Sequence, residues 1–219
     1  FLMPDEHVLI FANGELTNDN AILQITKNAT LIYAADGGLT HVQRLGLKPN
    51  LLIGDLDSVT PEQVRWAEER GAEVRRFPIQ KDETDLELAL LGAAQAGCRR
   101  ITIVGAIGDR VDQTLSNIFL LSLPELQDLD VRIEDGLQEI ILVRSALRLV
   151  GSPGDIVSLL PLPPLASGIT TTGLQFPLIN ENLVSSRSRG VSNRMLAENA
   201  SVKLESGMLL CIHVKKAGI

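Results

Sequence analysis

Cysteine, aromatic residues and long apolar segments are all scarce in this sequence of 219 residues. Its two cysteines, Cys98 and Cys211, form no CxxC pair, which excludes a zinc ribbon and a thioredoxin-like motif. We expect both to be reduced, buried thiols. No apolar run approaches the roughly 18 residues that a membrane span needs. The first residues hold no long apolar segment of the kind found in secretory signals, so we expect a cytoplasmic protein without membrane contact.

Basic residues are also in the minority. Lysine and arginine total 20 against 27 aspartate and glutamate residues, which gives a formal net charge of −7. Proteins that bind duplex nucleic acid normally carry a basic patch, so we expect neither nucleic acid nor an anionic membrane surface as a partner. An acidic protein can still bind polyphosphates when a divalent cation lies between them.

The first part of the chain alternates short apolar runs with amphipathic stretches. This βαβα rhythm predicts a parallel sheet with helices on its faces. In one of the expected helices, Thr60 is the N-cap, Pro61 opens the helix and Gly71 ends it. We expect strands at residues 7–12, 30–35, 51–53, 72–77 and 100–104, and helices at residues 19–26, 38–45, 61–70, 84–96 and 113–121.

The pattern changes near residue 130. Strand-like segments separated by turn residues follow one another, and helices are missing apart from a turn near residues 193–197. Such a series is typical of a sandwich or a barrel. We place the domain boundary at Gly136, which gives an α/β domain over residues 1–136 and an all-β domain over residues 137–219. The strands expected here are residues 130–134, 139–143, 146–150, 156–160, 200–205 and 208–214, the first of them still in the first sheet.

Acidic residues follow most of the expected parallel strands. Ligands bind at the carboxyl ends of such strands, so these acids would converge at one edge of the sheet. Unpaired, they would repel one another, and a divalent cation removes that repulsion. Asp55 and Asp57 are two residues apart, and on an extended backbone both would point toward one Mg²⁺ ion. The alternative is an Asx-turn followed by a helix N-cap at Asp57 or Ser58.

Two further segments favour a phosphate ligand. Lys81 to Asp85 opens a helix, with Asp82 and Asp85 on one face of its first turn. A capped helix would explain the acids but not Lys81, which suits a phosphate. Gly105 to Asp112 forms a glycine-rich turn whose N–H groups can approach phosphate oxygens, with Arg110 as an added donor. The turn is neither a Walker A motif nor a GxGxxG fingerprint.

Other catalytic motifs are missing. The sequence holds no HExxH and no GxSxG segment. The three histidines, His7, His41 and His213, stand far apart in the sequence, so we interpret each as a structural or surface residue.

Six short motifs follow one another along the chain: AADGG (34–38), GDLDS (54–58), KDETD (81–85), GAIGDRVDQ (105–113), TTGLQFPL (171–178) and GVSN (190–193). Taken together, these motifs resemble those of the thiamine pyrophosphokinase family. Their order and spacing match over nearly the whole chain.

The resemblance implies an α/β domain followed by a small β-sandwich, acting as a homodimer with the active site near the subunit interface. It implies Mg²⁺-dependent transfer of the pyrophosphoryl group of ATP to the hydroxyethyl oxygen of thiamine, which gives thiamine diphosphate and AMP.

The implied site residues match the family motifs position by position. Asp55, Asp57 and Asp85 would be catalytic and hold the metal. Asp36, Gly37, Lys81, Asp82, Thr84, Arg110 and Asp112 would bind the nucleotide and its phosphates, and Phe176, Ser192 and Asn193 would contact thiamine.

Two positions depart from the family pattern. Gln113 stands where many members have His, and Phe176 stands where Tyr or Trp is common. Phenylalanine keeps a stacking face but loses the polar group.

Two other functions remain open at this point. A metal-dependent nucleotide-sugar transferase would use Asp55 and Asp57 as its D-x-D motif, but it leaves the Lys81–Asp85 segment unexplained. A sensor that binds a nucleotide or thiamine without any transfer would keep the same residues.

Overall fold

The computed structural model describes residues 6–16 and 18–216. The chain divides into two compact units, one up to Gly136 and the other from Leu137 onward. Among the described residues, no helix has the length and apolar character to cross a bilayer. Cys98 and Cys211 are both free and buried, as expected.

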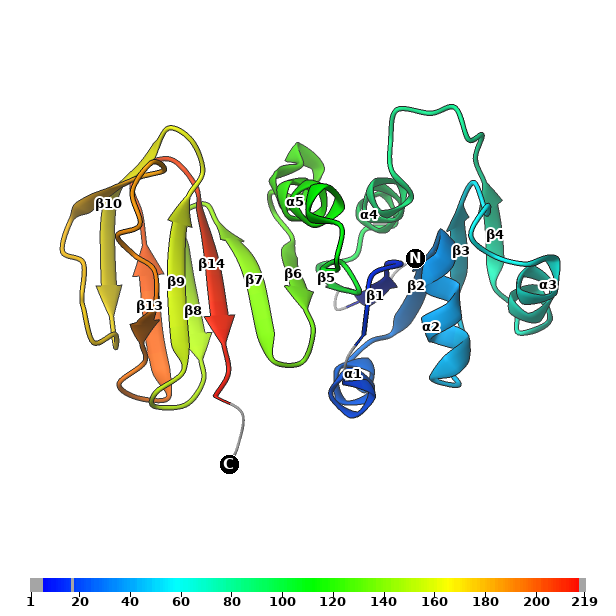
Figure 1. Cartoon of the computed structure of the whole chain (residues 1–219), viewed down its shortest axis with the longest axis horizontal. Helices are drawn as coiled ribbons and strands as arrows, with labels where there is room; N and C mark the ends of the chain where they lie inside the picture. Colours follow the sequence, from blue (N-terminus) through cyan, green and yellow to red (C-terminus); the bar gives the residue numbers. More distant parts are fainter. Residues whose placement is uncertain (1–5, 17, 217–219) are drawn as a thin grey trace. The chain divides into compact units, whose positions relative to one another are not determined.

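The first unit is a parallel sheet covered by helices (Figure 1). Its strands are β1 (His7–Phe11), β2 (Leu31–Ala35), β3 (Leu51–Gly54), β4 (Glu73–Arg76), β5 (Arg100–Val104) and β6 (Asp130–Glu134). Its helices are α1 (Asp19–Thr26), α2 (Leu39–Arg44), α3 (Pro61–Glu69), α4 (Asp85–Gln95) and α5 (Val111–Phe119), with short 3-10 turns η1 (Asp36–Gly38), η2 (Leu120–Ser122) and η3 (Pro124–Leu126).

The strand order creates a switch point beside β1. The order is β6-β5-β1-β2-β3-β4, and every neighbouring pair is parallel. The chain therefore moves outward from β1 to β4 and then returns to the other side of β1 as β5. Open sheets of this type bind ligands where the strand order reverses, at the carboxyl ends of the strands. That edge is therefore where a site is expected in this unit.

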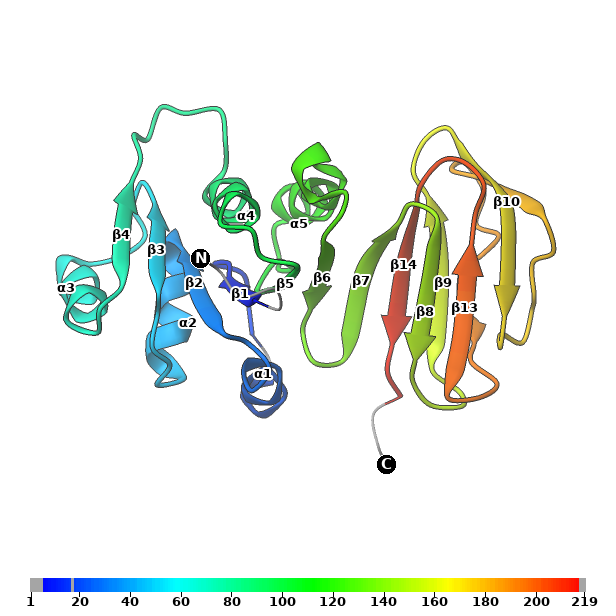
Figure 2. The ribbon, with the colours of Figure 1, turned by 180° about the vertical axis from the view of Figure 1, so that it is seen from behind.

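Helices on both faces bury the sheet. Ile22 of α1, Leu39 of α2 and Ala67 of α3 pack with sheet residues such as Phe11 in one cluster. Helix α4 contacts β1, β2 and β3 and lies with α5 on one side of the sheet, whereas α1 lies on the other (Figures 1 and 2). The predicted α/β arrangement is confirmed.

Local capping fixes where helix α3 begins. The Thr60 hydroxyl accepts from Gln63 N at 3.3 Å, and Gln63 Oε1 accepts from Thr60 N at 2.9 Å. This reciprocal pair is a capping box, with Pro61 in the first helical position. The predicted N-cap is confirmed, whereas capping by Asp57 or Ser58 is not observed.

The second unit consists of two antiparallel sheets, with strand orders β12-β9-β14-β7 and β11-β10-β13-β8. Buried residues from both sheets, among them Val157, Cys211, Leu149 and Val202, form one core, so the predicted sandwich is confirmed. The strands are β7 (Gln138–Val143), β8 (Ala146–Val150), β9 (Ile156–Pro161), β10 (Leu165–Thr172), β11 (Glu181–Val184), β12 (Asn193–Arg194), β13 (Asn199–Lys203) and β14 (Leu209–Val214).

Three details differ from the prediction. Strands β10 and β11 were not expected, and β10 contains Gly168 at φ 64° beside a register shift between Ala166 and Ile169. That irregularity interrupts the alternation from which a strand is recognised. The turn expected near residues 193–197 begins as β12, which pairs with β9. Helix α5 starts at Val111 rather than at residue 113.

Candidate functional site

A cleft of about 650 Å³ opens at the switch point of the first unit. Residues that follow β1, β2, β3 and β5 line it, and the N-terminal ends of α4 and α5 add others. Its volume lies in the range of small-molecule sites. The polar and acidic lining residues include Asn13, Glu15, Asp36, Asp55, Asp57, Ser58, Thr84, Asp85, Asp109, Arg110, Asp112, Gln113, Thr114, Ser116 and Asn117.

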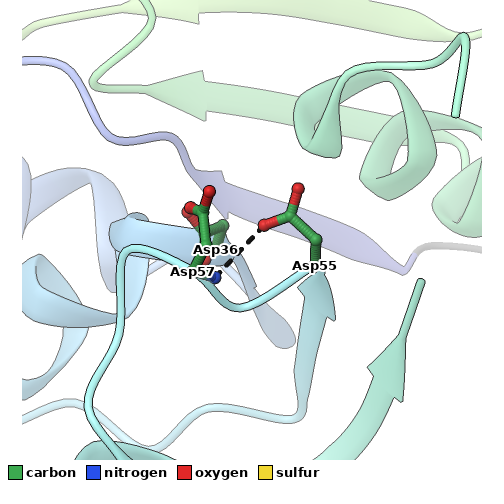
Figure 3. A group of neighbouring side chains, drawn as sticks. All are labelled: Asp36, Asp55 and Asp57. Atoms are coloured by element: carbon green, nitrogen blue, oxygen red, sulfur yellow. Dashed lines mark hydrogen bonds between the residues drawn. The ribbon is translucent and has the colours of Figure 1, made fainter. Parts of the chain in front are cut away.

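Three carboxylates form a cluster in this cleft (Figure 3). Asp36, Asp55 and Asp57 each offer an oxygen, and these oxygens lie within 4.8 Å of one another. Asp36 starts the turn after β2 and is only 6% exposed, with φ at 43°. Carboxylate oxygens gathered in this way suit a hard divalent cation.

The loop after β3 is bent rather than extended. Leu56 adopts φ 64°, and Asp57 N donates to Asp55 Oδ1 at 3.1 Å. The expectation of an extended backbone between Asp55 and Asp57 is therefore wrong, and the Asx-turn forms instead. The turn nevertheless brings both carboxylates to Asp36, and Ser58 Oγ donates to Asp57 Oδ1 at 3.0 Å.

Lys81 is held between two acids. Its Nζ lies 3.1 Å from Asp55 Oδ2 and 3.0 Å from Asp85 Oδ1, and its side chain is largely buried. Burial disfavours the charged forms of both Asp55 and Lys81, but the hydrogen bonds that these two residues form outweigh the effect of burial. They lower the pKa of Asp55 and raise the pKa of Lys81. Lys81 thus offsets part of the negative charge in the cleft.

Asp85 packs against the end of β3. Burial is the main cause that raises the pKa of Asp85; Lys81 opposes this, and the charges of Asp55 and Asp36 add to it. Gly54 leaves room for this arrangement, because a Cβ there would lie 2.9 Å from Asp85 Cγ and 3.1 Å from Asp36 Cβ. Gly54 also has φ 147°, which side chains rarely adopt.

The glycine-rich turn after β5 forms another wall of the cleft. Gly108 N donates to Thr114 Oγ1 at 3.1 Å, and Asn117 Nδ2 donates to Ala106 O at 2.8 Å. Both side chains belong to α5, so the helix fixes the turn. Arg110 forms a two-point ion pair with Asp112, through Nε at 3.1 Å and Nη2 at 2.5 Å, and both side chains are exposed.

The structure therefore gathers most of the predicted residues of the first unit in one place. Three do not line the cleft. One is Lys81, which nevertheless contacts Asp55 and Asp85 of the lining. Gly37 is buried behind it, where a Cβ would lie 2.4 Å from the Asn13 side chain. Asp82 is exposed and precedes α4, which begins at Asp85 with Thr84 as its N-cap. The expectation that Asp82 and Asp85 share the first helical turn is wrong.

Several lining residues were not among the predicted ones. Asn13 and Glu15 follow β1 directly, so the rule about strand ends could have identified them. Thr114 and Asn117 lie within α5, and only their contacts with the glycine-rich turn reveal them.

The second unit contains a smaller pocket of about 250 Å³. Phe176 and Asn193 line it together with Leu159 and Val191, and Phe176 is 63% exposed. The buried Asn193 amide accepts from Phe176 N at 3.0 Å and donates to Phe176 O at 2.7 Å. Asn193 therefore holds Phe176 in place. Ser192 is exposed at φ 60° and does not line this pocket.

Two family models match this chain, one in each unit. The catalytic domain of thiamin pyrophosphokinase matches residues 22–133, which include the acidic cluster. The vitamin B1 binding domain of thiamin pyrophosphokinase matches residues 141–209, which include Phe176 and Asn193.

Individual relatives agree with these matches. A thiamine pyrophosphokinase from Bacillus subtilis is 26% identical over 197 residues, covering 85% of this chain and 88% of its own. Thiamine pyrophosphokinase 1 from Arabidopsis thaliana is 24% identical over 250 aligned positions, covering 100% and 93%. The crystal structure of the Bacillus subtilis thiamine pyrophosphokinase has a TM-score of 0.86 at 25% identity, covering 97% of this chain and 100% of that one. The chain belongs to the thiamin pyrophosphokinase family.

Proposed function

We propose that this protein transfers the pyrophosphoryl group of ATP to thiamine, with Mg²⁺ as cofactor, and releases AMP and thiamine diphosphate. The oxygen of the thiamine hydroxyethyl group forms a bond to the β-phosphorus of ATP. The bond from that phosphorus to the oxygen shared with the α-phosphorus breaks, and AMP keeps the oxygen. The hydroxyl proton leaves as the new ester forms.

The observation that carries this proposal is the acidic cluster in the cleft of the unit that matches the catalytic family model. Asp36, Asp55 and Asp57 fit a magnesium site, because they supply only carboxylate oxygens and lie in an opening wide enough for a nucleotide. Asp85 stands beside them as a further acid. A bound magnesium ion supplies positive charge that offsets the charge on the phosphate oxygens.

Other residues in the cleft or in contact with its lining serve to position the triphosphate. Transfer of a phosphoryl group depends on alignment and charge stabilisation more than on covalent catalysis. We assign Lys81 and Arg110 to the phosphates, since both can exchange their present carboxylate partners for phosphate oxygens. Backbone N–H groups between this turn and the N-terminus of α5 add donors, apart from Gly108 N, which already donates to Thr114 Oγ1.

We place the thiamine ring against Phe176 in the second unit. Thiamine carries a permanent positive charge, and an exposed aromatic face attracts such a cation. Asn193 supports this role through the backbone of Phe176. The homodimer and the cytoplasmic location expected from the sequence stay predictions.

A product assay tests the proposed function directly. The purified protein would be incubated with ATP, Mg²⁺ and thiamine, and products would be separated by chromatography. We expect equal amounts of AMP and thiamine diphosphate, neither of which forms without thiamine or in the presence of EDTA. Formation of ADP with thiamine monophosphate would contradict the proposed reaction. Binding of both ligands without any product would indicate a sensor.

A further inference from the structure

A second hollow adjoins the pocket of Phe176. It has a volume of about 370 Å³, and it shares the lining residues Ser188 and Arg189 with that pocket. The two hollows are therefore adjacent at these residues. We call them together the groove, with an apolar end around Phe176 and a basic end around Arg187 and Arg189. Neither the proposed transfer nor the acidic cluster uses the basic end.

The basic end is unusual in a chain of net charge −7. Arg187 is exposed and forms no salt bridge among residues 6–16 and 18–216. Arg189 pairs with Glu181, so one carboxylate already contacts this end of the groove. An arginine without a charged partner, facing a hollow, is suited to a phosphate, which its planar guanidinium binds through two hydrogen bonds.

The loop that carries both arginines is fixed at its two ends. Arg187 N donates to Val184 O at 3.0 Å, and Leu159 N donates to Gly190 O at 2.9 Å. Gly190 has φ 104°, and a Cβ there would lie 2.6 Å from Leu159 O. The backbone that carries the arginines is therefore anchored, and so is the backbone of Phe176, which Asn193 holds.

We propose that this groove binds the phosphorylated vitamin, with the ring on Phe176 and the diphosphate at Arg187 and Arg189. The proposal rests on the proposed function, since it takes that reaction's product as the ligand. Thiamine has no anionic group, so the basic end favours the product over the substrate. Thiamine diphosphate therefore acts as an inhibitor that competes with thiamine at the second unit.

Calorimetric titrations without ATP and Mg²⁺ test this proposal. The ligands would be thiamine, thiamine diphosphate and inorganic pyrophosphate. The proteins would be the wild type, Arg187→Gln and Arg148→Gln, the last as a control because Arg148 is an exposed arginine of β8 outside the groove. We expect Arg187→Gln to weaken thiamine diphosphate binding about tenfold, since hydrogen bonds between charged groups are lost.

The other arms separate the roles of ring and phosphate. We expect the affinity of Arg187→Gln for thiamine to stay within about twofold of the wild-type value. The control substitution Arg148→Gln should leave the affinities for thiamine and thiamine diphosphate unchanged, because exposed charges usually contribute little. Three outcomes would each overturn the proposal. Arg187→Gln could lose affinity equally for thiamine and thiamine diphosphate, or it could keep its full affinity for the diphosphate. Alternatively, inorganic pyrophosphate could bind to the wild type as tightly as thiamine diphosphate does. A wild type that binds thiamine diphosphate but forms no AMP would instead overturn the proposed function alone.

Discussion

Charge balance around Lys81 decides what the cleft attracts. One lysine contacts Asp55 and Asp85, while Asp36 and Asp57 complete an acidic group with more negative than positive charge. Such a group favours a cation, and a cation in turn makes the cleft able to bind an anionic triphosphate. Lys81 adds a positive charge directly beside this group, since its Nζ lies 3.1 Å from Asp55 Oδ2.

Asp57→Asn tests the importance of this charge at a single position. Asp57 is exposed, so the fold should survive, while the amide removes one negative ligand oxygen. We expect kcat/KM for AMP formation to fall about 100-fold or more, the range seen when one charge-stabilising group is lost. Steady-state kinetics would be combined with circular dichroism of the folded protein.

Asp82→Asn is the matched control for that change. Asp82 is an exposed aspartate of the same motif, but it does not line the cleft. We expect nearly unchanged activity, although the sequence resemblance assigned Asp82 to the nucleotide site. Equal losses in the two variants would show that the cleft lining does not define the site, and an active Asp57→Asn enzyme would refute the metal assignment.

At the scale of single elements, α3 depends on its capping box. The Thr60 hydroxyl accepts from Gln63 N, and this bond satisfies a donor that the first helical turn leaves free. We expect Thr60→Ala to lower the free energy of unfolding by about 1 kcal/mol. Urea denaturation would measure the loss. Thr60→Ser keeps the hydroxyl and should restore most of it; a serine variant as unstable as the alanine variant would exclude capping as the cause.

A buried charge network joins the elements of the second unit. His213 of β14 is fully buried, with Nδ1 2.9 Å from Glu139 Oε1 and Nε2 2.9 Å from Asp155 Oδ2. The bond to Glu139 is the main cause that raises the pKa of His213, and burial opposes it. Burial also opposes ionisation of Asp155, but hydrogen bonds from Lys216 N, Ser152 N and His213 outweigh it and lower the pKa of Asp155.

These shifts predict how stability depends on pH. Because the pKa of His213 is raised on folding, its contribution is complete below the unfolded value of about 6.5 and is lost as the pH rises through the folded value. Asp155 behaves in the opposite way, and its contribution is lost in acid as the pH falls through its lowered folded value.

His213→Gln therefore has an expected pH signature. It should destabilise the protein by about 3 kcal/mol at pH 6, because two buried carboxylates lose their cation. The difference from the wild type should be smaller at pH 9 than at pH 6, because the contribution of the protonated histidine is lost as the pH rises through its raised pKa. Urea unfolding at both pH values would measure this. The loss of unfolding free energy caused by Thr60→Ala should be the same at pH 6 and pH 9. If the loss caused by His213→Gln were also the same at both pH values, the positive charge assigned to His213 would be contradicted.

At the scale of the whole molecule, the sequence predicted the order of strands and helices better than it predicted backbone bends and contacts between distant residues. Buried strands such as β1 and β5 are short apolar runs, so the α/β order and the all-β region were recognisable. The bend at Leu56 and the bulge near Gly168 were not, because φ angles of this kind leave little trace in a hydrophobic pattern. The ion pair between Lys81 and Asp55 joins residues 26 positions apart, and only the folded sheet brings them together.

The division of the chain into two units raises the question of how the proposed substrates meet. The acidic cluster belongs to the unit matched by the catalytic model, and Phe176 to the unit matched by the vitamin-binding model. If the protein is a homodimer whose sites combine residues of both subunits, two chains that are each inactive through a different substitution can recover activity when they form a mixed dimer. Asp55→Asn and Phe176→Ala are suitable partners, since each affects a different unit.

Mixing these two variants under conditions that allow subunit exchange gives a quantitative prediction. Random pairing makes half of the dimers mixed, and each mixed dimer has one intact site, so we expect about a quarter of wild-type activity. Each variant alone should stay nearly inactive, and native mass spectrometry would verify the mixed dimers. If verified mixed dimers show no recovery, ATP and thiamine bind within one chain, because a site built from one chain always carries one of the two substitutions.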